Sequence, residues 1–381
     1  LRSVSHVLAV IIANYHKDDT KYVIPNVVIR ADDMTEILAF QLSQFGRTIP
    51  NQLKKQLAKV LGKFNEYSLS KYKGNKKTVS LRDLVRLTHP TPCNQAQADL
   101  YGRIVSDTLE TPYTWEVNIS ARGNIKEVWE ELIDSNALGY MAMLRNLRNM
   151  EDKVSIQHLA DVAERLENPE EVKKSKQLPF RFYSAYKQVI TPALRNSLSK
   201  ALETSLSNIE RLEGRTLIAV DVSASMRSPI SKHSEVHCDE IARILGAMTS
   251  TLCEEYDLII FDEKYREIRF NPKHNLLARI NSMKFNGGGT DIGLAFDFAN
   301  KQPFNYDRII ILSDNECNCG NNNVKFNGYK LNKNKNCFLH EVDLQGYGTC
   351  QFKGKHHNYI AGWSEKVLSY ITLAEQGLGS M

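Results

Sequence analysis

The chain has 381 residues, with 49 Lys and Arg against 44 Asp and Glu, a formal charge of +5. That excess is too small to indicate a nucleic-acid-binding protein from the total alone. Hydrophobic residues make up 42% and charged residues 24%, which excludes global disorder. No apolar run approaches the roughly 18 residues of a membrane span, and no signal peptide is recognisable. Seven scattered cysteines predict reduced thiols and a cytoplasmic location rather than a disulfide framework.

The charge is unevenly distributed along the chain. Residues 1–213 carry 30 basic and 25 acidic side chains, whereas residues 214–381 carry 19 of each. Basic density peaks between Arg47 and Arg103, with Phe and Tyr interleaved, and the cluster comprises Lys54, Lys55, Lys59, Lys63, Lys71, Lys73, Lys76, Lys77, Arg82 and Arg86. Such a cluster neutralises phosphates and steers an anionic partner. An ordinary solvated helix face remains an open alternative at this point.

In the first 210 residues, apolar side chains recur at helical spacing and strand signals are nearly absent. The pattern predicts a helix around residues 4–12, and Asp33 with Glu36 predicts a capping box that opens a second helix. A third helix is expected over residues 53–61, with the lysines on the face opposite its leucines.

Further along this region, Ser80 and Asp83 predict the start of a short helix that ends before His89. The clearest amphipathic pattern covers residues 125–133, and the polar stretch 167–176 is expected to be a loop or linker. Many short helices predict an α-solenoid or an irregular helical array.

The last 170 residues alternate between strand and helix patterns. Short apolar runs predict strands over residues 216–221, 258–261, 308–312 and 338–342, with helices at 241–252, 276–283 and 292–299 between them. This alternation favours a parallel, doubly wound α/β sheet with its site at the carboxyl ends of the strands.

Oxygen-bearing side chains follow these predicted strands. Asp221, Ser223 and Ser225 form a D-x-S-x-S turn after the first strand, and Asp314 follows a later one. A glycine-rich loop brings Thr290 near, where it is also expected to cap the next helix. Hard oxygen ligands in this number suit Mg²⁺ or Mn²⁺. The D-x-S-x-S turn by itself is equally compatible with an ordinary helix cap.

The enzyme alternatives lack necessary residues. A phosphatase that forms an aspartyl phosphate needs a second Asp two residues after Asp221, and Ser223 stands there. The G-x-S-x-G turn of a serine hydrolase is absent, and the glycine loop lacks the Gly-Lys-Ser/Thr of a P-loop. Of the functions considered, a metal-dependent hydrolase therefore has the least support from the sequence.

A zinc site near the C-terminus is a further alternative. Its candidate ligands are Cys317, Cys319, Cys337, Cys350, His340, His356 and His357. Their spacing matches no common C-x₂-C pair, so free or buried thiols are the default interpretation.

The motifs together resemble a known family. Residues 219–226, 288–291 and 313–316 are similar to the von Willebrand factor A-type domain of the Ro/TROVE family. Upstream, residues 84–90, 140–150 and 178–181 resemble that family's helical segments. The resemblance implies a HEAT-like helical region over residues 1–212 and a von Willebrand factor A-like metal-binding domain over residues 213–381.

The resemblance also implies a function without catalysis. Members bind small structured non-coding RNAs, the Y RNAs, and 3′ ends of misfolded RNAs, and serve RNA quality control, in bacteria with an exoribonuclease partner. Neither a membrane nor DNA is expected as a partner. The RNA-facing residues by resemblance are Arg82, Arg86, His89, Arg145 and Arg148 beside Lys54, Lys55, Lys59 and Lys63, and the metal ligands are Asp221, Ser223, Ser225, Thr290 and Asp314. By residue type alone, His89 is a structural histidine and the two arginines of 140–150 are helix-pairing cations.

Two departures from the family pattern stand out. Helices that close the family's ring precede the position that matches Leu1, so we expect a fragment, an open ring or a ring closed by another chain. The Asn- and Lys-rich segment 317–336 is expected to replace a helix. The rival function from another class is a metal-dependent protein-adhesion module, in which the helical region is only a scaffold.

Overall fold

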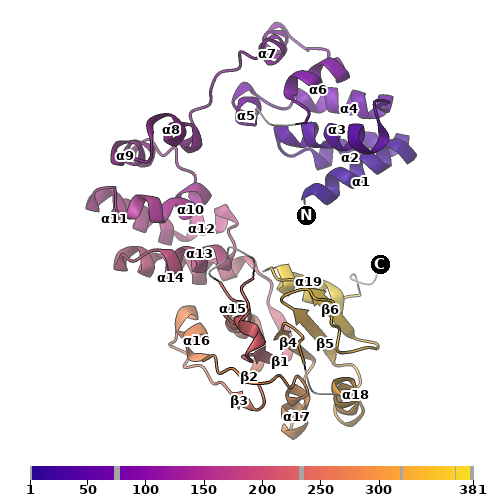
Figure 1. Cartoon of the computed structure of the whole chain (residues 1–381), viewed down its shortest axis with the longest axis vertical. Coiled ribbons are helices and arrows are strands. Elements are labelled where there is room, and N and C mark those ends of the chain that lie inside the picture. Colours follow the sequence, from indigo (N-terminus) through magenta and orange to yellow (C-terminus); the bar gives the residue numbers. More distant parts are fainter. Residues whose placement is uncertain (1, 73–77, 231–235, 318–320, 365, 378–381) are drawn as a thin grey trace. The chain divides into compact units, whose positions relative to one another are not determined.

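The computed structural model describes residues 2–72, 78–230, 236–317, 321–364 and 366–377 (Figure 1). The chain divides into two compact units, Leu1–Val128 and Trp129–Met381. The predicted boundary at 212/213 marks a different feature, the change from helices to strands, since the first strand begins at Leu212. No helix among the described residues is long and apolar enough to cross a membrane.

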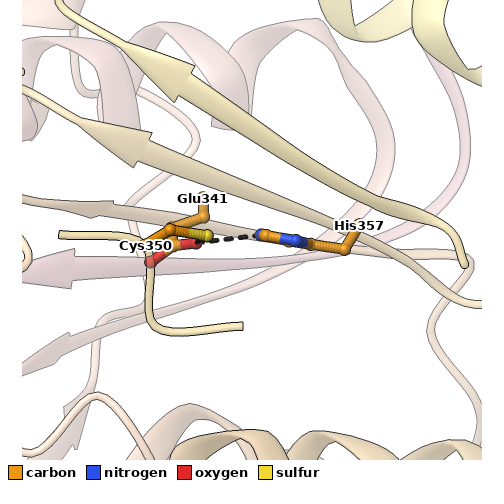
Figure 2. A group of neighbouring side chains, drawn as sticks. All are labelled: Glu341, Cys350 and His357. Carbon is orange, nitrogen blue, oxygen red and sulfur yellow. Dashed lines mark hydrogen bonds and ion pairs between the residues drawn. The ribbon is translucent and has the colours of Figure 1, made fainter. Parts of the chain in front are cut away.

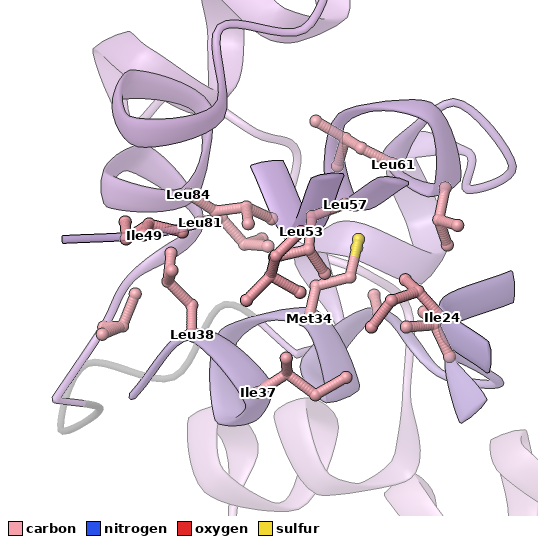
Figure 3. Packing of buried hydrophobic residues seen from close by; sticks show 14 of the residues in the cluster. Ile24, Met34, Ile37, Leu38, Ile49, Leu53, Leu57, Leu61, Leu81 and Leu84 are labelled. Atoms are coloured by element: carbon pink, nitrogen blue, oxygen red, sulfur yellow. The ribbon is translucent and has the colours of Figure 1, made fainter. Parts of the chain in front are cut away.

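The first unit is entirely helical in its described residues. Its helices are α1 (Arg2–Tyr15), η1 (Lys17–Asp19), α2 (Thr20–Val27), α3 (Ala31–Phe45), α4 (Asn51–Leu61), α5 (Glu66–Ser70), α6 (Leu81–Thr88), α7 (Gln95–Ser106) and α8 (Trp115–Arg122), with α9 (Lys126–Asp134) leading into the second unit. Met34 and Leu38 of α3 meet Leu57 of α4 and Leu84 of α6 in one buried cluster (Figure 3). The predicted helical array is confirmed, and the apolar stripes of α4 and α6 are their buried faces. In α1 the predicted stripe is wrong, because Val4 and Leu8 are exposed and the helix buries the side that carries Ala9, Val10 and Ala13.

Two helix starts show how capping works in this unit. The predicted capping box at Asp33 and Glu36 is wrong, because α3 begins at Ala31 and Asp33 lies in its first turn. The Asp33 carboxylate accepts the backbone N–H of Arg30 at 2.6 Å and of Ile29 at 2.9 Å, and so caps the helix from inside. The second prediction is confirmed: Ser80 and Asp83 form a capping box on α6.

The second unit begins with stacked helices. They are α10 (Tyr140–Glu151), α11 (Ile156–Glu167), α12 (Pro169–Ser175), α13 (Pro179–Gln188), α14 (Pro192–Ser205) and η2 (Leu206–Asn208). The predicted loop over residues 167–176 is wrong, because α12 occupies most of it. Asn168 accepts the N–H groups of Glu170 and Glu171, and Pro169 takes the first helical position, where its missing N–H costs nothing.

A six-stranded sheet follows in the same unit. Its strands are β1 (Leu212–Asp221), β2 (Cys253–Phe261), β3 (Tyr265–Glu267), β4 (Arg308–Ser313), β5 (Phe338–Asp343) and β6 (His357–Ala361), in the order β3-β2-β1-β4-β5-β6. All neighbours are parallel except β2 and β3. The predicted parallel sheet and its four apolar strands are confirmed, whereas β3 and β6 are short, half-exposed edge strands without an apolar run.

Helices cover both faces of the sheet, as a doubly wound fold requires. The helices are η3 (Ser225–Arg227), α15 (Cys238–Leu252), α16 (Leu276–Ser282), α17 (Leu294–Lys301), α18 (Asn322–Asn332) and α19 (Lys366–Glu375). On one face, Gly246 of α15 lies so close to β1 that a Cβ would stand 2.7 Å from Val220 Cγ2. On the other face, Phe296 of α17 and Phe326 of α18 pack with the strands. The expectation that segment 317–336 lacks a helix is wrong, because α18 lies within it.

The C-terminal helix is fixed to the sheet by a buried ion pair. Arg308 of β4 donates to both carboxylate oxygens of Glu375 in α19, at 2.8 and 2.9 Å, and His340 Nε2 lies 2.9 Å from Oε1. These donors hold the pKa of Glu375 at about 2 despite its burial. Burial lowers the pKa of His340, so its imidazole is neutral at pH 7.

Replacing Glu375 with Gln is expected to lower the free energy of unfolding by about 3 kcal/mol at pH 7, because Arg308 keeps its charge in the interior without a counter-charge. The pKa of Glu375 is depressed in the folded state, so the stabilisation is complete above the unfolded value of 4.5 and is lost as the pH falls toward about 2. Urea unfolding across this pH range measures the difference. The exposed Glu164→Gln is the control, and a difference that does not shrink at low pH would contradict the prediction.

Candidate functional site

The turn after β1 is organised around the Asp221 carboxylate. Asp221 is the last residue of the strand and is fully buried. Its Oδ1 accepts the backbone N–H of Ser223 at 2.8 Å, and its Oδ2 accepts the Ser313 hydroxyl from the end of β4 at 2.5 Å. These bonds fix the turn and lock the ends of two neighbouring strands together.

Two hydroxyls connect this carboxylate to a second one. The Ser223 and Ser225 hydroxyl oxygens lie 3.3 Å apart, and Ser225 donates to Asp314 Oδ1 at 3.2 Å. Asp314 directly follows β4 and is 1% exposed. The structure therefore brings together Asp221, Ser223, Ser225 and Asp314, although Asp314 lies 93 positions after Asp221 in the sequence.

The glycine-rich loop lies against the same turn. Ala224 N–H donates to Gly288 O, and Gly287 N–H donates to Val222 O, both at 3.0 Å. Gly287 and Gly288 have φ of +79° and +107°, which favour glycine. The loop continues to Thr290, which is 5% exposed and whose backbone oxygen accepts the Cys317 thiol at 3.3 Å, so its role as a metal ligand stays a prediction.

Thr290 does not have its second expected role. The predicted cap on the following helix is wrong, because α17 begins at Leu294 with Gly293 at its N-cap and without a side-chain cap. The chain instead turns through Asp291, whose carboxylate accepts the Gly293 N–H at 2.9 Å. The helix starts two residues later than the apolar pattern predicts.

The site concentrates uncompensated negative charge. Burial raises the pKa of Asp221 to about 6 and raises the pKa of Asp314 as well. Neither carboxylate lies within 4.0 Å of a Lys, Arg or His in the part of the chain that the structure describes. Two buried carboxylates with two hydroxyls form an all-oxygen donor set, which fits a small divalent cation such as Mg²⁺ or Mn²⁺.

The role of Ser313 was not predicted from the sequence, although the residue belongs to the 313–316 motif. Its hydroxyl donates to Asp221 and so orients that carboxylate, and its Oγ also accepts the Asn315 N–H at 3.0 Å. Only the pairing of β1 with β4 reveals this, because the register sets Val220 beside Leu312 and so Asp221 beside Ser313.

The predicted lysine face of α4 is confirmed as a structural feature. Lys55, Lys59 and Lys63 are exposed and Lys54 is half-buried, whereas Leu57 on the opposite side is buried. None of these lysines has an ion pair within 4.0 Å among the described residues. Of the remaining cluster, Lys73, Lys76 and Lys77 lie outside the described residues.

The end of α6 forms a shallow depression beside α7. Arg86 and His89 lie at it with Pro90, Pro92 and Tyr101. His89 is exposed and adopts a left-handed conformation, with φ of 49°, where it ends the helix. Arg82, one turn earlier, is half-buried and lies 4.0 Å from Asp107.

The remaining predicted RNA contacts lie in the second unit. Arg145 and Arg148 are exposed on α10, whose opposite side is buried. Arg145 lines a depression with Arg181 of α13. Arg181 was not singled out from the sequence, although its exposed position between the buried Phe180 and Phe182 is a recognisable signal.

The C-terminal zinc candidates do not gather as one set. His340 faces Glu375 on one side of the sheet, and Cys337 is buried on the other, where its thiol contacts Phe338 O. Cys319 lies outside the described residues. Cys350 and His357 do meet, together with a carboxylate that the sequence did not point to.

Two family models match the chain in sequence. The TROVE domain matches residues 106–256, and the Ro60 vWA domain matches residues 215–330. The chain belongs to the Ro/TROVE family. The matched regions together include the depression at Arg145 and the Asp221–Asp314 site, whereas α4 and α6 lie before them and Cys350 and His357 lie after them.

Relatives of this family member match only in part. RNA-binding protein RO60 of Caenorhabditis elegans is 28% identical over 211 residues, which are 51% of this chain and 32% of that protein. Telomerase protein component 1 of Mus musculus is 46% identical over 82 residues, which are 21% of this chain and 3% of that protein. The chain therefore spans a third or less of the length of these relatives.

A solved structure shares the fold. The crystal structure of the Deinococcus radiodurans RO (RSR) protein superposes with a TM-score of 0.76 at 18% identity, covering 99% of this chain and 87% of that chain. This likeness shows the fold of the Ro/TROVE chain and nothing of its ligands.

Mg²⁺ is expected to stabilise the wild-type protein, by about 2.7 kcal/mol at one hundred times its dissociation constant. Asp221→Asn is expected to abolish this effect, because the amide supplies no charge to the cation and its NH₂ group opposes the Ser313 hydroxyl. Thermal unfolding with and without Mg²⁺ at pH 7.5 measures it. Asp161→Asn, an exposed carboxylate of α11, is the control. An undiminished Mg²⁺ shift in Asp221→Asn would exclude the site.

Proposed function

We propose that this chain is a non-enzymatic RNA-binding protein that holds small structured Y-like RNAs and the 3′ ends of misfolded RNAs, in RNA quality control or ribonucleoprotein assembly. The observation that carries the proposal is a set of exposed cations on α4, α6 and α10 that have no ion pair within 4.0 Å among the described residues: Lys55, Lys59, Arg86, Arg145 and Arg148. Family membership and the printed name of the worm relative, an RNA-binding protein, support it.

The exposed cations of the helices suit phosphates because no ion pair within the described residues has to break before a phosphate binds. Lys55, Lys59 and Arg86 are exposed and have no ion pair within 4.0 Å among the described residues. A protein that pairs such groups with phosphates releases counterions, which drives binding at low salt. The proline-walled depression beside Arg86 and His89 offers an apolar surface next to a phosphate contact.

The proposed role of the sheet domain is to present a metal ion. Asp221 and Asp314 would hold Mg²⁺, with the Ser223 and Ser225 hydroxyls and Thr290 as further ligands. The cation would supply an open coordination position for an acidic group. Ala224 and Glu316 at the rim are exposed, so the site opens to solvent at the strand ends. An exoribonuclease or another protein with an acidic side chain is the proposed partner there.

The same opening favours a second candidate, a metal-dependent protein-adhesion module without RNA affinity. Chelation of the metal ion distinguishes the two functions, because it affects protein binding in one and leaves RNA binding intact in the other. In the adhesion module, EDTA and Asp221→Asn abolish capture of a protein partner, and no RNA binds at any salt concentration. In the RNA-binding protein, RNA affinity survives EDTA, because the helical cations need no metal.

A filter-binding titration with a small structured RNA at low salt tests the primary proposal. Replacing Arg82 and Arg86 with Glu is expected to weaken binding about tenfold or more and to reduce the slope of log K against log salt by about 1 to 2, since two phosphate contacts are lost.

The matched control is Lys273→Glu with Lys284→Glu, an equal charge change at exposed positions of the sheet domain. That variant is expected to bind RNA nearly as the wild type does. An absence of binding at low salt, or equal losses in both double variants, would refute the assignment of RNA contacts to α6.

A further inference from the structure

A separate group of side chains lies at the far edge of the sheet, away from the β1–β4 turn. Glu341 of β5, Cys350 of the following segment and His357 at the start of β6 converge there (Figure 2). Their ligand atoms all lie within 4.8 Å of one another. His357 Nε2 is 2.9 Å from Glu341 Oε2, and Cys350 Sγ is 3.4 Å from the same oxygen.

The buried Glu341 carboxylate has no permanent counter-charge beside it. Its side chain is fully buried, on the sheet face that carries Leu339 and Phe352 of the apolar cluster. The half-buried Glu375 of this domain is held by a guanidinium, whereas the fully buried Glu341 has no Lys or Arg within 4.0 Å among the described residues. An isolated carboxylate is costly in such surroundings unless it is paired or binds a metal.

The identity of the three donors selects the cation. A thiolate and an imidazole are poor ligands for Mg²⁺ or Ca²⁺ and good ones for Zn²⁺. We propose that Glu341, Cys350 and His357 bind one Zn²⁺ ion, with water in the fourth position. A thiolate and a carboxylate together balance the two positive charges, so the occupied site is neutral.

The distances are close to those of a tetrahedral ion. Zn²⁺ bonds of 2.0–2.3 Å at tetrahedral angles set neighbouring ligand atoms about 3.4–3.6 Å apart. The distance of 3.4 Å between Glu341 Oε2 and Cys350 Sγ already lies in this range. The distance of 2.9 Å between Glu341 Oε2 and His357 Nε2 must increase by about half an ångström. Glu341 is fully buried, so this opening requires a small movement of the half-buried His357 side chain, while the exposed Cys350 leaves the third side accessible to the ion.

Neighbouring groups hold two of the ligands in orientation. Gln351 N–H donates to Glu341 Oε1 at 2.8 Å, which leaves Oε2 for the ion. The Phe352 ring packs edge-on against the His357 imidazole, with centroids 5.9 Å apart. Such supporting contacts are what fixed metal sites have around their ligands. Bound Zn²⁺ would fasten the segment between β5 and β6 to the sheet.

The test uses the full chain, freed of metal with a chelator and titrated with Co²⁺ alone. Tetrahedral Co²⁺ with a thiolate ligand gives visible d–d bands and a sulfur-to-cobalt charge-transfer band, which an all-oxygen site such as Asp221–Asp314 does not produce. The wild type is expected to show one equivalent of this spectrum, displaced by Zn²⁺. Cys350→Ser is expected to abolish the charge-transfer band and to weaken Zn²⁺ binding by about a hundredfold or more.

Two controls and a second ligand variant complete the design. Cys93→Ser changes another exposed cysteine, and Asp221→Asn changes the other candidate site, so both are expected to keep the spectrum. His357→Gln is expected to weaken Zn²⁺ binding as Cys350→Ser does. Circular dichroism verifies that each variant is folded. The proposal is overturned if the folded wild type gives no charge-transfer band with excess Co²⁺, or if the band persists in Cys350→Ser.

Discussion

The hydrogen bond from Ser313 to Asp221 joins the ends of the two central strands, and the candidate metal site depends on it. Because β1 and β4 are parallel neighbours, everything that follows either strand emerges at the same edge of the sheet. The register then sets Asp314 near the turn that carries Ser223 and Ser225. The glycine loop completes the edge, since its backbone pairs with this turn instead of with a strand.

The sheet domain buries several carboxylates, and each is stabilised differently. Glu375 is held by a guanidinium and a neutral imidazole. Asp343 accepts three backbone N–H groups and the Tyr359 hydroxyl. Asp221 and Asp314 have hydroxyls and backbone amides, and Glu341 has a thiol and an imidazole. Among the described residues, Asp343, the Asp221–Asp314 pair and Glu341 all lack a Lys or Arg within 4.0 Å. Asp343 is satisfied by its four donors, whereas the other two groups combine donor atoms of several residues that suit a cation.

Sequence reasoning succeeded where one local pattern decides the structure. Apolar runs located β1, β2, β4 and β5, and a D-x-S-x-S turn after a buried strand located most of the candidate metal site. It failed where a short polar helix depends on its caps: α12 follows from Asn168 and Pro169, yet its polar composition predicts a loop. It also failed at Glu341, because a glutamate inside a strand pattern gives no sign of the thiol and imidazole that folding places beside it.

Burial also changes how the charge of the sheet domain is interpreted. Residues 214–381 carry equal numbers of basic and acidic side chains. Among the described residues of this region, the buried acids are Asp221, Asp239, Asp262, Asp314, Glu341 and Asp343, whereas Arg308 is the buried base. The exposed surface is therefore richer in basic than in acidic side chains, although the formal charge of the region is zero. Burial does not remove these acidic charges, so the sheet domain as a whole stays neutral, and the attraction for a polyanion is centred on the lysine-rich helices, where the basic excess of the chain lies.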